Sequence, residues 1–265
     1  MSAAASDIDV ALTAADAGAA VVRAAYGTRP VRHAKSDRDF ATDADLDAER
    51  AILDVLTKER PGDRVLGEET GESGGSGARR WLVDPLCGTL NFAAQTPLFA
   101  VNVALADDSG VIAAVSADPI TGERFWTDGA RAFVRRGSVD EPMTPSADSH
   151  LVNVNCDGPA DLPFVGPQLV GDPVFVAAFG PRVLSTTLAL AWVAAGRQAG
   201  YVTDGALVDN VHFAAGIALC RGAGCIVTDL AGESLVEGRG LIAAADAATH
   251  QRLVEIVRPH LTAAQ

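Results

Sequence analysis

Four strand-like runs between residues 100 and 136 constrain the fold of this chain more than any other feature. They cover residues 100–105, 111–117, 123–127 and 132–136. The turn sequences Asp107-Asp108-Ser109-Gly110 and Asp128-Gly129 lie between runs and suit antiparallel hairpins. Helical segments come in blocks before and after these runs. The pattern therefore predicts a layered α+β fold rather than a doubly wound sheet.

Two amphipathic helices are expected before this sheet. Residues 8–26 place apolar side chains at steps of three or four and end at Gly27. A second helix begins at Thr42 or Asp43 and runs to about residue 58. Further along, the expected elements are a strand over residues 64–67, a flexible glycine-rich loop over 70–77, and a buried strand over 81–83 that leads into Asp84.

The second half of the chain is predicted to form a lobe of its own. Residues 137–150 are polar and contain two prolines, so we place the boundary there, with lobes over residues 1–145 and 146–265 in one compact unit. The expected elements are strands over residues 151–155, 226–228 and 241–245, helices over 185–195, 211–221 and 247–257, and a loop over 157–180.

The formal net charge of −13 limits the partners of the chain. Such a surface repels nucleic acid and anionic membranes. A phosphorylated ligand is compatible with it only where bound cations reverse the local charge. Residues 1–20 lack the basic segment of a signal peptide, and no apolar run approaches the ~20 residues of a membrane span. Four irregularly spaced cysteines suggest no disulfide framework, which favours a cytoplasmic protein.

The segment from Asp84 to Thr89 has the composition of a metal and phosphate site. Pro85 fixes its own backbone and biases Asp84 towards an extended conformation. Gly88 permits close backbone approach, so the amides of Gly88 and Thr89 can bind an anion. Oxygen ligands from Glu68, Asp84 and a loop carbonyl suit Mg²⁺, which polarises phosphate and activates a water. Taken singly, each of these motifs is more often an ordinary turn.

Three segments in this order resemble the inositol monophosphatase family. They are Gly67-Glu68-Glu69, residues 84–92 (Asp-Pro-Leu-Cys-Gly-Thr-Leu-Asn-Phe) and residues 211–216 (Val-His-Phe-Ala-Ala-Gly). Lys35, residues 42–49 and residues 193–197 extend the resemblance over nearly the whole chain. It implies a layered α/β/α/β/α fold with two mixed or antiparallel sheets and helices between them. It also implies a Mg²⁺-dependent phosphatase, usually a homodimer, that hydrolyses a small metabolite's phosphate monoester (a sugar, polyol, amino-alcohol or nucleotide phosphate).

The resemblance also assigns roles to particular residues. Glu68, Asp84 and the carbonyl of Leu86 would hold the first metal ion, and Glu68 with Thr89 would activate the attacking water. The amides of Gly88 and Thr89 would hold the phosphate. Asp45 would support Thr89 or a loosely held third ion. Lys35 and Glu69 would not bind the metal themselves but would help to position its ligands.

The chain departs from the family pattern at the second metal. Cys87 and His212 replace two aspartates, and Val211 replaces a tryptophan. Asp84, Cys87, His212 and a water would form a softer site suited to Zn²⁺, Mn²⁺ or another transition metal. Alternatively, one Mg²⁺ at the intact position supports slower hydrolysis, or the protein binds a phosphorylated ligand in a regulatory or structural role without turnover.

Simpler interpretations of the two substituted residues remain. Cys87 can be a small buried thiol, and His212 can be a helix-start residue bonded to the backbone. Asp209, three residues before His212, is a candidate substitute carboxylate. The place where inositol-specific members often carry an acidic residue holds Gly205, with Asp204 next to it. Inositol phosphate itself is therefore not favoured as the substrate, and residues 157–180 are expected to help shape the pocket.

Overall fold

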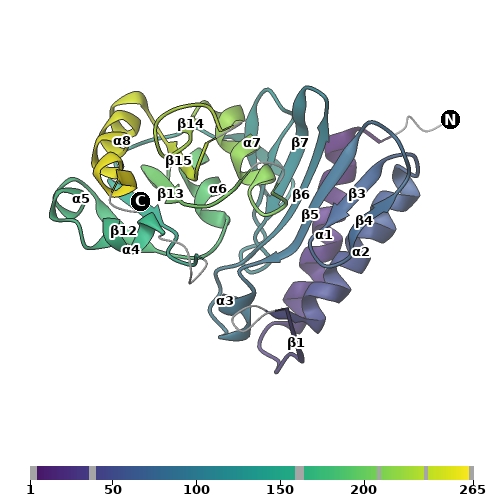
Figure 1. Cartoon of the computed structure of the whole chain (residues 1–265). Helices are drawn as coiled ribbons and strands as arrows, with labels where there is room; N and C mark the ends of the chain where they lie inside the picture. The colour runs from purple at the N-terminus through teal and green to yellow at the C-terminus, as the bar shows by residue number, and fades with distance from the viewer. Residues whose placement is uncertain (1–4, 36–39, 159–163, 208–209, 236–237, 263–265) are drawn as a thin grey trace.

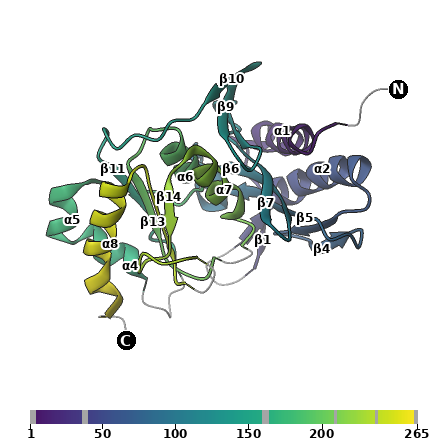
Figure 2. The same ribbon diagram turned by 90° about the horizontal axis from the view of Figure 1, so that it is seen from above.

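The computed structural model describes residues 5–35, 40–158, 164–207, 210–235 and 238–262, and within them helices and sheets alternate in five layers (Figures 1 and 2). The elements of the first half are α1 (Asp7–Ala25), β1 (Arg32–Ala34), β2 (Phe40–Thr42), α2 (Asp43–Glu59), β3 (Arg64–Gly67), β4 (Gly71–Gly74), β5 (Arg80–Cys87), α3 (Thr89–Ala93), β6 (Ala100–Asp107), β7 (Gly110–Ala117), β8 (Arg124–Thr127), β9 (Ala132–Arg136) and β10 (Val139–Pro142). Those of the second half are β11 (Leu151–Val154), α4 (Val165–Val170), α5 (Pro173–Ala178), β12 (Gly180–Val183), α6 (Leu188–Ala194), β13 (Gly200–Thr203), α7 (Ala214–Ala223), β14 (Ile226–Thr228), β15 (Leu241–Ala244) and α8 (Ala247–Thr262).

The first sheet has eight strands in the order β10-β9-β8-β7-β6-β5-β3-β4. Its strands are antiparallel except for β3 and β5, which run side by side in the same direction. Helices α1 and α2 cover one face. Small side chains let them pack closely: a Cβ on Gly18 would lie 2.8 Å from Cδ1 of Ile52. Ser6, which was not predicted as a cap, caps α1 by accepting from the amide of Asp9.

Helices α6 and α7 form the central layer between the two sheets (Figure 1). Nearly every residue of α6 is buried, which suits a helix that is apolar on all sides. One cluster joins side chains of the first sheet, such as Phe125, to both helices and to Tyr201 of the second sheet. The two halves therefore share a continuous core, and the candidate site lies at one end of it.

The second sheet has five strands in the order β12-β11-β13-β15-β14. Helices α4, α5 and α8 cover its outer face, where Val165, Leu169 and Phe175 are buried. The prediction of a loop over residues 157–180 was wrong for most of this stretch, because α4 and α5 form there. Asp172 caps α5 by accepting from two amides, and Pro173 occupies the first helical position. The stretch thus holds a helix-start signal within its glycine and proline content.

The structure differs from the sequence predictions at several other places. Residues 71–74, expected in a loop, form β4 and pair with β3. Strand β5 does not end at Asp84: it continues to Cys87 through an irregularity in its pairing with β6. The predicted lobe boundary contains β10, and strands β1, β2, β12 and β13 were not predicted. Short strands of three or four residues carry too little periodicity to be recognised from sequence alone.

The layered α/β/α/β/α fold with two sheets, one of them mainly antiparallel and both mixed, is confirmed. The first sheet ends at Pro142 and the second begins at Leu151, a division compatible with the proposed boundary after residue 145, which stays a prediction. Among the described residues, no helix combines the length and the apolar character needed to cross a bilayer.

Candidate functional site

Glu68, Asp84 and His212 come together from two strands and a helix start. The parallel pairing of β3 with β5 places Gly67 beside Val83, so the next residue of each strand, Glu68 and Asp84, lies at the same edge. His212 precedes α7 and reaches them from the second half of the chain. Its Nδ1 lies 2.8 Å from Oδ2 of Asp84 and 3.9 Å from Oε2 of Glu68.

Asp84 and His212 form an ion pair. Burial raises the pKa of Asp84, but the positive charge and hydrogen bond of His212 outweigh it and leave that pKa below its ordinary value. Burial likewise lowers the pKa of His212, yet the charge and hydrogen bond of Asp84 raise it to about 12. The amide of Leu86 donates to the other oxygen of Asp84 at 3.2 Å. Asp84 is therefore fully buried, ionised and held from two sides.

Glu68 has one carboxylate oxygen that makes no hydrogen bond to the described residues. Lys35 donates to Oε1 of Glu68 at 2.9 Å and to Glu69 at 2.6 Å. The buried Oε2 has no hydrogen-bond partner among the described residues. Burial and the charge of Asp84 raise the pKa of Glu68 to about 8, although His212 and Lys35 oppose the shift. Two buried carboxylates that repel each other, one with an unused oxygen, fit a divalent cation.

The hydroxyl of Thr89 contacts two further predicted residues, Asp45 and Leu86. Its Oγ1 is 3.0 Å from Oδ1 of Asp45 and 3.1 Å from the carbonyl oxygen of Leu86. Because the hydroxyl has one proton, it can donate to only one of these acceptors at a time. Burial raises the pKa of Asp45 to about 6 despite the hydrogen bonds from Thr42 and Thr89. The contact expected between Asp45 and Thr89 is thus present, while its role stays a prediction.

Gly88 provides the backbone geometry of the turn between β5 and α3. Its φ of 105° lies in the left-handed region, and a Cβ there would lie 2.8 Å from the carbonyl oxygen of Leu98. No residue other than glycine fits at this position. The amides that follow Gly88 begin α3 and have no acceptor within the helix. Asn91 anchors this turn by donating to the carbonyls of Leu98 and Ser185, both at 2.8 Å.

Cys87 completes a cluster of potential metal ligands. The ligand atoms of Asp84, Cys87 and His212 all lie within 4.8 Å of one another. Burial and the charge of Asp84 raise the pKa of the Cys87 thiol. The fold therefore brings the three residues together, although Asp84 and His212 are 128 positions apart in the sequence.

Glu49 of α2 positions the Glu68 loop, a role that the sequence analysis did not assign. Its carboxylate accepts from the amides of Glu69 at 2.9 Å and Thr70 at 2.8 Å. A Cβ on Gly67 would lie 2.5 Å from this carboxylate, which explains the glycine. A signal was available, because Asp45 and Glu49 lie four residues apart and so share the helix face that also meets Thr89.

Asp209 and Asp204 are the remaining acidic residues considered near the edge of the site. Asp209 lies outside the described residues, so the predicted substitute carboxylate has no structural account. Asp204 turns towards Arg239, which donates to it at 2.7 Å, and it also accepts from the amides of Val165 and Gly205. These contacts occupy the carboxylate. Asp204 therefore supports the second sheet and is not free to contact a polyol.

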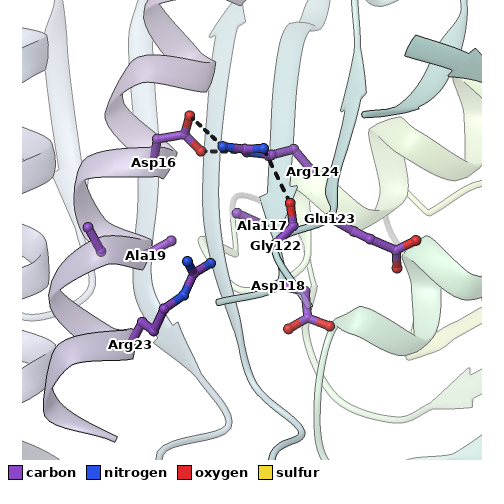
Figure 3. A pocket seen from close by; sticks show the side chains of 9 residues that line it. Asp16, Ala19, Arg23, Ala117, Asp118, Gly122, Glu123 and Arg124 are labelled. Atoms are coloured by element: carbon purple, nitrogen blue, oxygen red, sulfur yellow. Dashed lines mark hydrogen bonds and ion pairs between the residues drawn. The ribbon is translucent and has the colours of Figure 1, made fainter. Parts of the chain in front are cut away.

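Two hollows lie apart from the cluster. One, of about 190 Å³, lies between α1 and the end of β7, where Arg124 pairs with Asp16 at 2.7 Å (Figure 3). A larger one, of about 460 Å³, is lined by residues of β5, β6 and α7. None of the predicted site residues lines either hollow. Arg124 and Asp16 pair with each other in Figure 3, whereas Glu123 pairs with Arg136 and Arg197, so most of the charged groups at this hollow already have partners.

Known proteins resemble this chain along most of its length. The model of the inositol monophosphatase family matches residues 4–262. An inositol-1-monophosphatase of Caulobacter vibrioides is 32% identical over 240 residues, which cover 84% of this chain and 89% of that protein. The Nus factor SuhB of Escherichia coli is 33% identical over 207 residues, covering 75% of this chain and 74% of that protein.

Solved structures give the same result for the fold. The extragenic suppressor protein SuhB from Bartonella henselae superposes with a TM-score of 0.84 at 31% identity, covering 94% of this chain and 97% of that one. An IMPase of Thermotoga maritima superposes with a TM-score of 0.81 at 22% identity, covering 98% of each chain.

Proposed function

This chain belongs to the inositol monophosphatase family, and from that premise we propose that it hydrolyses the phosphate monoester of a small metabolite in a metal-dependent reaction. The observation that carries the proposal is the pair of buried carboxylates Glu68 and Asp84, which approach each other while one oxygen of Glu68 has no partner. Such a pair is costly unless a cation occupies the space between its members.

Glu68, Asp84 and the carbonyl of Leu86 would hold Mg²⁺, since all three offer hard oxygen ligands. A divalent cation bound there neutralises phosphate charge and makes a nearby water a better nucleophile. It also answers the charge problem of a chain with a net charge of −13. The amides of Gly88 and Thr89 would hold phosphate oxygens, as the left-handed turn at Gly88 allows.

Thr89 and Glu68 would position the attacking water. When the Thr89 hydroxyl donates to Asp45, its oxygen lone pairs remain free to accept a hydrogen bond from a water. Glu68 would take the proton that this water loses, because a bound cation would keep its carboxylate ionised near neutral pH. Lys35 and Glu69 hold Glu68 in place, and Glu49 holds the loop that carries both glutamates.

The substrate we propose is a phosphate ester other than inositol phosphate. Several relatives are named inositol-1-monophosphatase. In this chain, however, Gly205 offers no side chain where an acidic group is expected, and Asp204 is held by Arg239. A sugar, amino-alcohol, nucleotide or other polyol phosphate is therefore favoured over inositol phosphate itself.

A panel assay tests the proposal directly. Purified protein is stripped with chelator and given Mg²⁺, Mn²⁺ or Zn²⁺ with a set of phosphate monoesters, and released phosphate is measured. We expect turnover of at least one substrate with Mg²⁺ or Mn²⁺, lost on renewed chelation. Absence of phosphate release with every metal and substrate would refute the proposed hydrolysis.

A second candidate is a family member that binds a phosphorylated ligand without turnover. Its support is that His212 and Lys35 already neutralise Asp84 and Glu68, so the protein's own cations balance part of the carboxylate charge. Some relatives bear the name Nus factor SuhB, which is not an enzyme name. This candidate predicts a rise in Tm with a phosphorylated ligand and no phosphate release under any metal.

We further expect a cytoplasmic homodimer, as the resemblance and the free cysteines suggest. Light scattering at micromolar concentration measures the oligomeric state, and a mass near twice 27.3 kDa is the expected result. A mass near that of one chain at all concentrations would contradict it.

A further inference from the structure

We propose that Asp84, Cys87 and His212 form a site for a transition-metal ion of the Zn²⁺ class. The inference deepens the proposed function and rests on it for the shared site, because Asp84 belongs to both this set and the Mg²⁺ ligands. It concerns the second position of the site, where the chain presents a thiol and an imidazole instead of carboxylates.

The spacing of the three ligand atoms suits one small ion. Bonds of about 2.0–2.3 Å to Zn²⁺ place tetrahedral ligands roughly 3–4 Å apart. Here the ligand atoms lie within 4.8 Å of one another, and Nδ1 of His212 is 2.8 Å from Oδ2 of Asp84. An ion bound between these two atoms would widen that contact and replace the proton that His212 shares with Asp84.

The donor types determine which ion is preferred. Thiolate and imidazole bind Zn²⁺, Co²⁺ and related ions well, whereas Mg²⁺ prefers oxygen ligands and keeps its waters. Replacing two carboxylates by a thiol and an imidazole therefore shifts preference away from Mg²⁺ at this position. Three protein ligands also leave a fourth place open, which is the arrangement of a catalytic zinc site rather than a structural one.

A second observation, shared with the proposed Mg²⁺ position, also points to a cation beside this cluster. Oε2 of Glu68 is buried, has no hydrogen-bond partner among the described residues, and lies 3.9 Å from Nδ1 of His212. It is therefore close to one of the three proposed ligand atoms. An unpaired buried carboxylate oxygen is costly, and a bound cation removes that cost.

The backbone positions Cys87 and His212 before any ion arrives. Cys87 ends β5 and pairs with Ala100 in the first sheet. The backbone amide of His212 donates to Oδ1 of Asn210 at 2.9 Å, which fixes the backbone of His212 just before α7 begins. Since β5 and α7 belong to different layers, one ion bound by both should join them and raise the Tm.

Cobalt absorption tests the site without any substrate. Metal-free, reduced full-length protein is titrated with Co²⁺, and the thiolate-to-cobalt charge-transfer band in the near ultraviolet is recorded. We expect one equivalent to produce the band, a stoichiometric amount of Zn²⁺ to abolish it, and excess Mg²⁺ to leave it in place. Absence of the band with the wild-type protein would overturn the proposal.

Two substitutions locate the ion. Cys87→Ser should remove the band, while the matched control Cys156→Ser, which changes a free cysteine outside the cluster, should keep it. His212→Gln should weaken Co²⁺ binding at least about tenfold, as expected for loss of a ligand. A band that persists in Cys87→Ser would refute the site. Should Cys87→Ser unfold, unchanged Co²⁺ affinity in His212→Gln would refute it equally.

The two proposals fail in different ways. A cobalt band without phosphate release under any metal leaves the ion site standing and removes the hydrolase. Mg²⁺-dependent phosphate release without a cobalt band leaves the hydrolase standing and removes the ion site.

Discussion

The two sides of the candidate site are built differently. The carboxylate side, Glu68, Asp84 and the Leu86 carbonyl, comes from two neighbouring parallel strands and the turn that follows one of them. The opposite side, Cys87 and His212, needs β5 and the start of α7 to meet across two layers. The first side is fixed by local backbone pairing, and the second depends on tertiary packing.

This difference explains why the two sides can change independently. Strand register sets Glu68 beside Asp84 whatever happens at His212. The second side can therefore exchange carboxylates for other donors while the first stays intact. In the absence of metal, His212 and Lys35 balance the charge of the carboxylate side from opposite directions.

Asp84→Asn should have the largest effect, because Asp84 is a ligand in both proposed ion sites. Loss of its charge removes a metal ligand and the partner of His212. We expect kcat/KM for the best substrate to fall by about 10³-fold or more, the scale seen when one strong electrostatic group is removed from a site. The loss is measured as phosphate release by the purified variant, after circular dichroism has verified that the variant is folded.

The matched control is Asp118→Asn, which changes a buried carboxylate that caps the turn after β7. Its kcat/KM should stay within about twofold of wild type, as expected for a residue remote from the chemistry. Equal losses in both variants would show that Asp84 acts only through stability.

Glu49→Gln should displace the loop that carries Glu68, because Glu49 binds the backbone amides of that loop. The amide group of glutamine presents a donor to backbone amides that need an acceptor, so one of them loses its bond. We expect activity to fall about 10–100-fold and stability by about 1–3 kcal/mol. Denaturant unfolding and kinetics measure both. Glu59→Gln, at the exposed end of α2, should change neither, and unaltered kinetics in Glu49→Gln would show that Glu49 does not position Glu68.

Restoring both carboxylates sharpens the comparison further. Cys87→Asp combined with His212→Asp should raise the preference for Mg²⁺ over Zn²⁺ by about tenfold or more, since oxygen donors replace softer ones. The metal-free double variant should be less stable than wild type, because four carboxylates then crowd together without His212. Metal titrations of activity and Tm provide the measurements. An unchanged metal profile would mean that neither residue contacts an ion.

The smallest effect expected is on pH dependence. His212 has an ordinary pKa of 6.5 when unfolded and about 12 when folded, so its contribution to stability is complete below pH 6.5 and is lost as pH rises above it. The ring is 39% exposed, so the loss should stay below the limit of about 1.4 kcal/mol per pH unit. Between pH 6 and 8, the Tm of metal-free wild type should fall roughly 2–4 °C more than that of His212→Gln. Parallel curves would contradict the ion pair.

The sequence predicted those parts of the fold that carry strong local signals. The α1 and α2 helices have clear caps and apolar periodicity, and β3 occupies the predicted residues 64–67. The α4 and α5 helices were missed because glycine and proline dominate residues 157–180, although Asp172 and Pro173 marked a helix start. The four-residue strand β13 offered too short a pattern to recognise.

The site was predictable where order along the chain sufficed. The order of the motifs indicated that Glu68 and Asp84 act together, and β3–β5 pairing places them at one edge. The ion pair between His212 and Asp84 spans 128 positions and depends on how two layers pack, which no local pattern contains. Glu49 was missed because it bonds to backbone amides, whose positions are unknown before the fold is known.

The claim on which everything else depends is that the carboxylate side holds a divalent cation. The most direct measurement is an anomalous difference map from crystals grown with Mn²⁺ and inorganic phosphate. A Mn²⁺ peak bounded by the carboxylates of Glu68 and Asp84 and the carbonyl of Leu86 is the result predicted. A map without a peak among these three groups at saturating Mn²⁺ would contradict it.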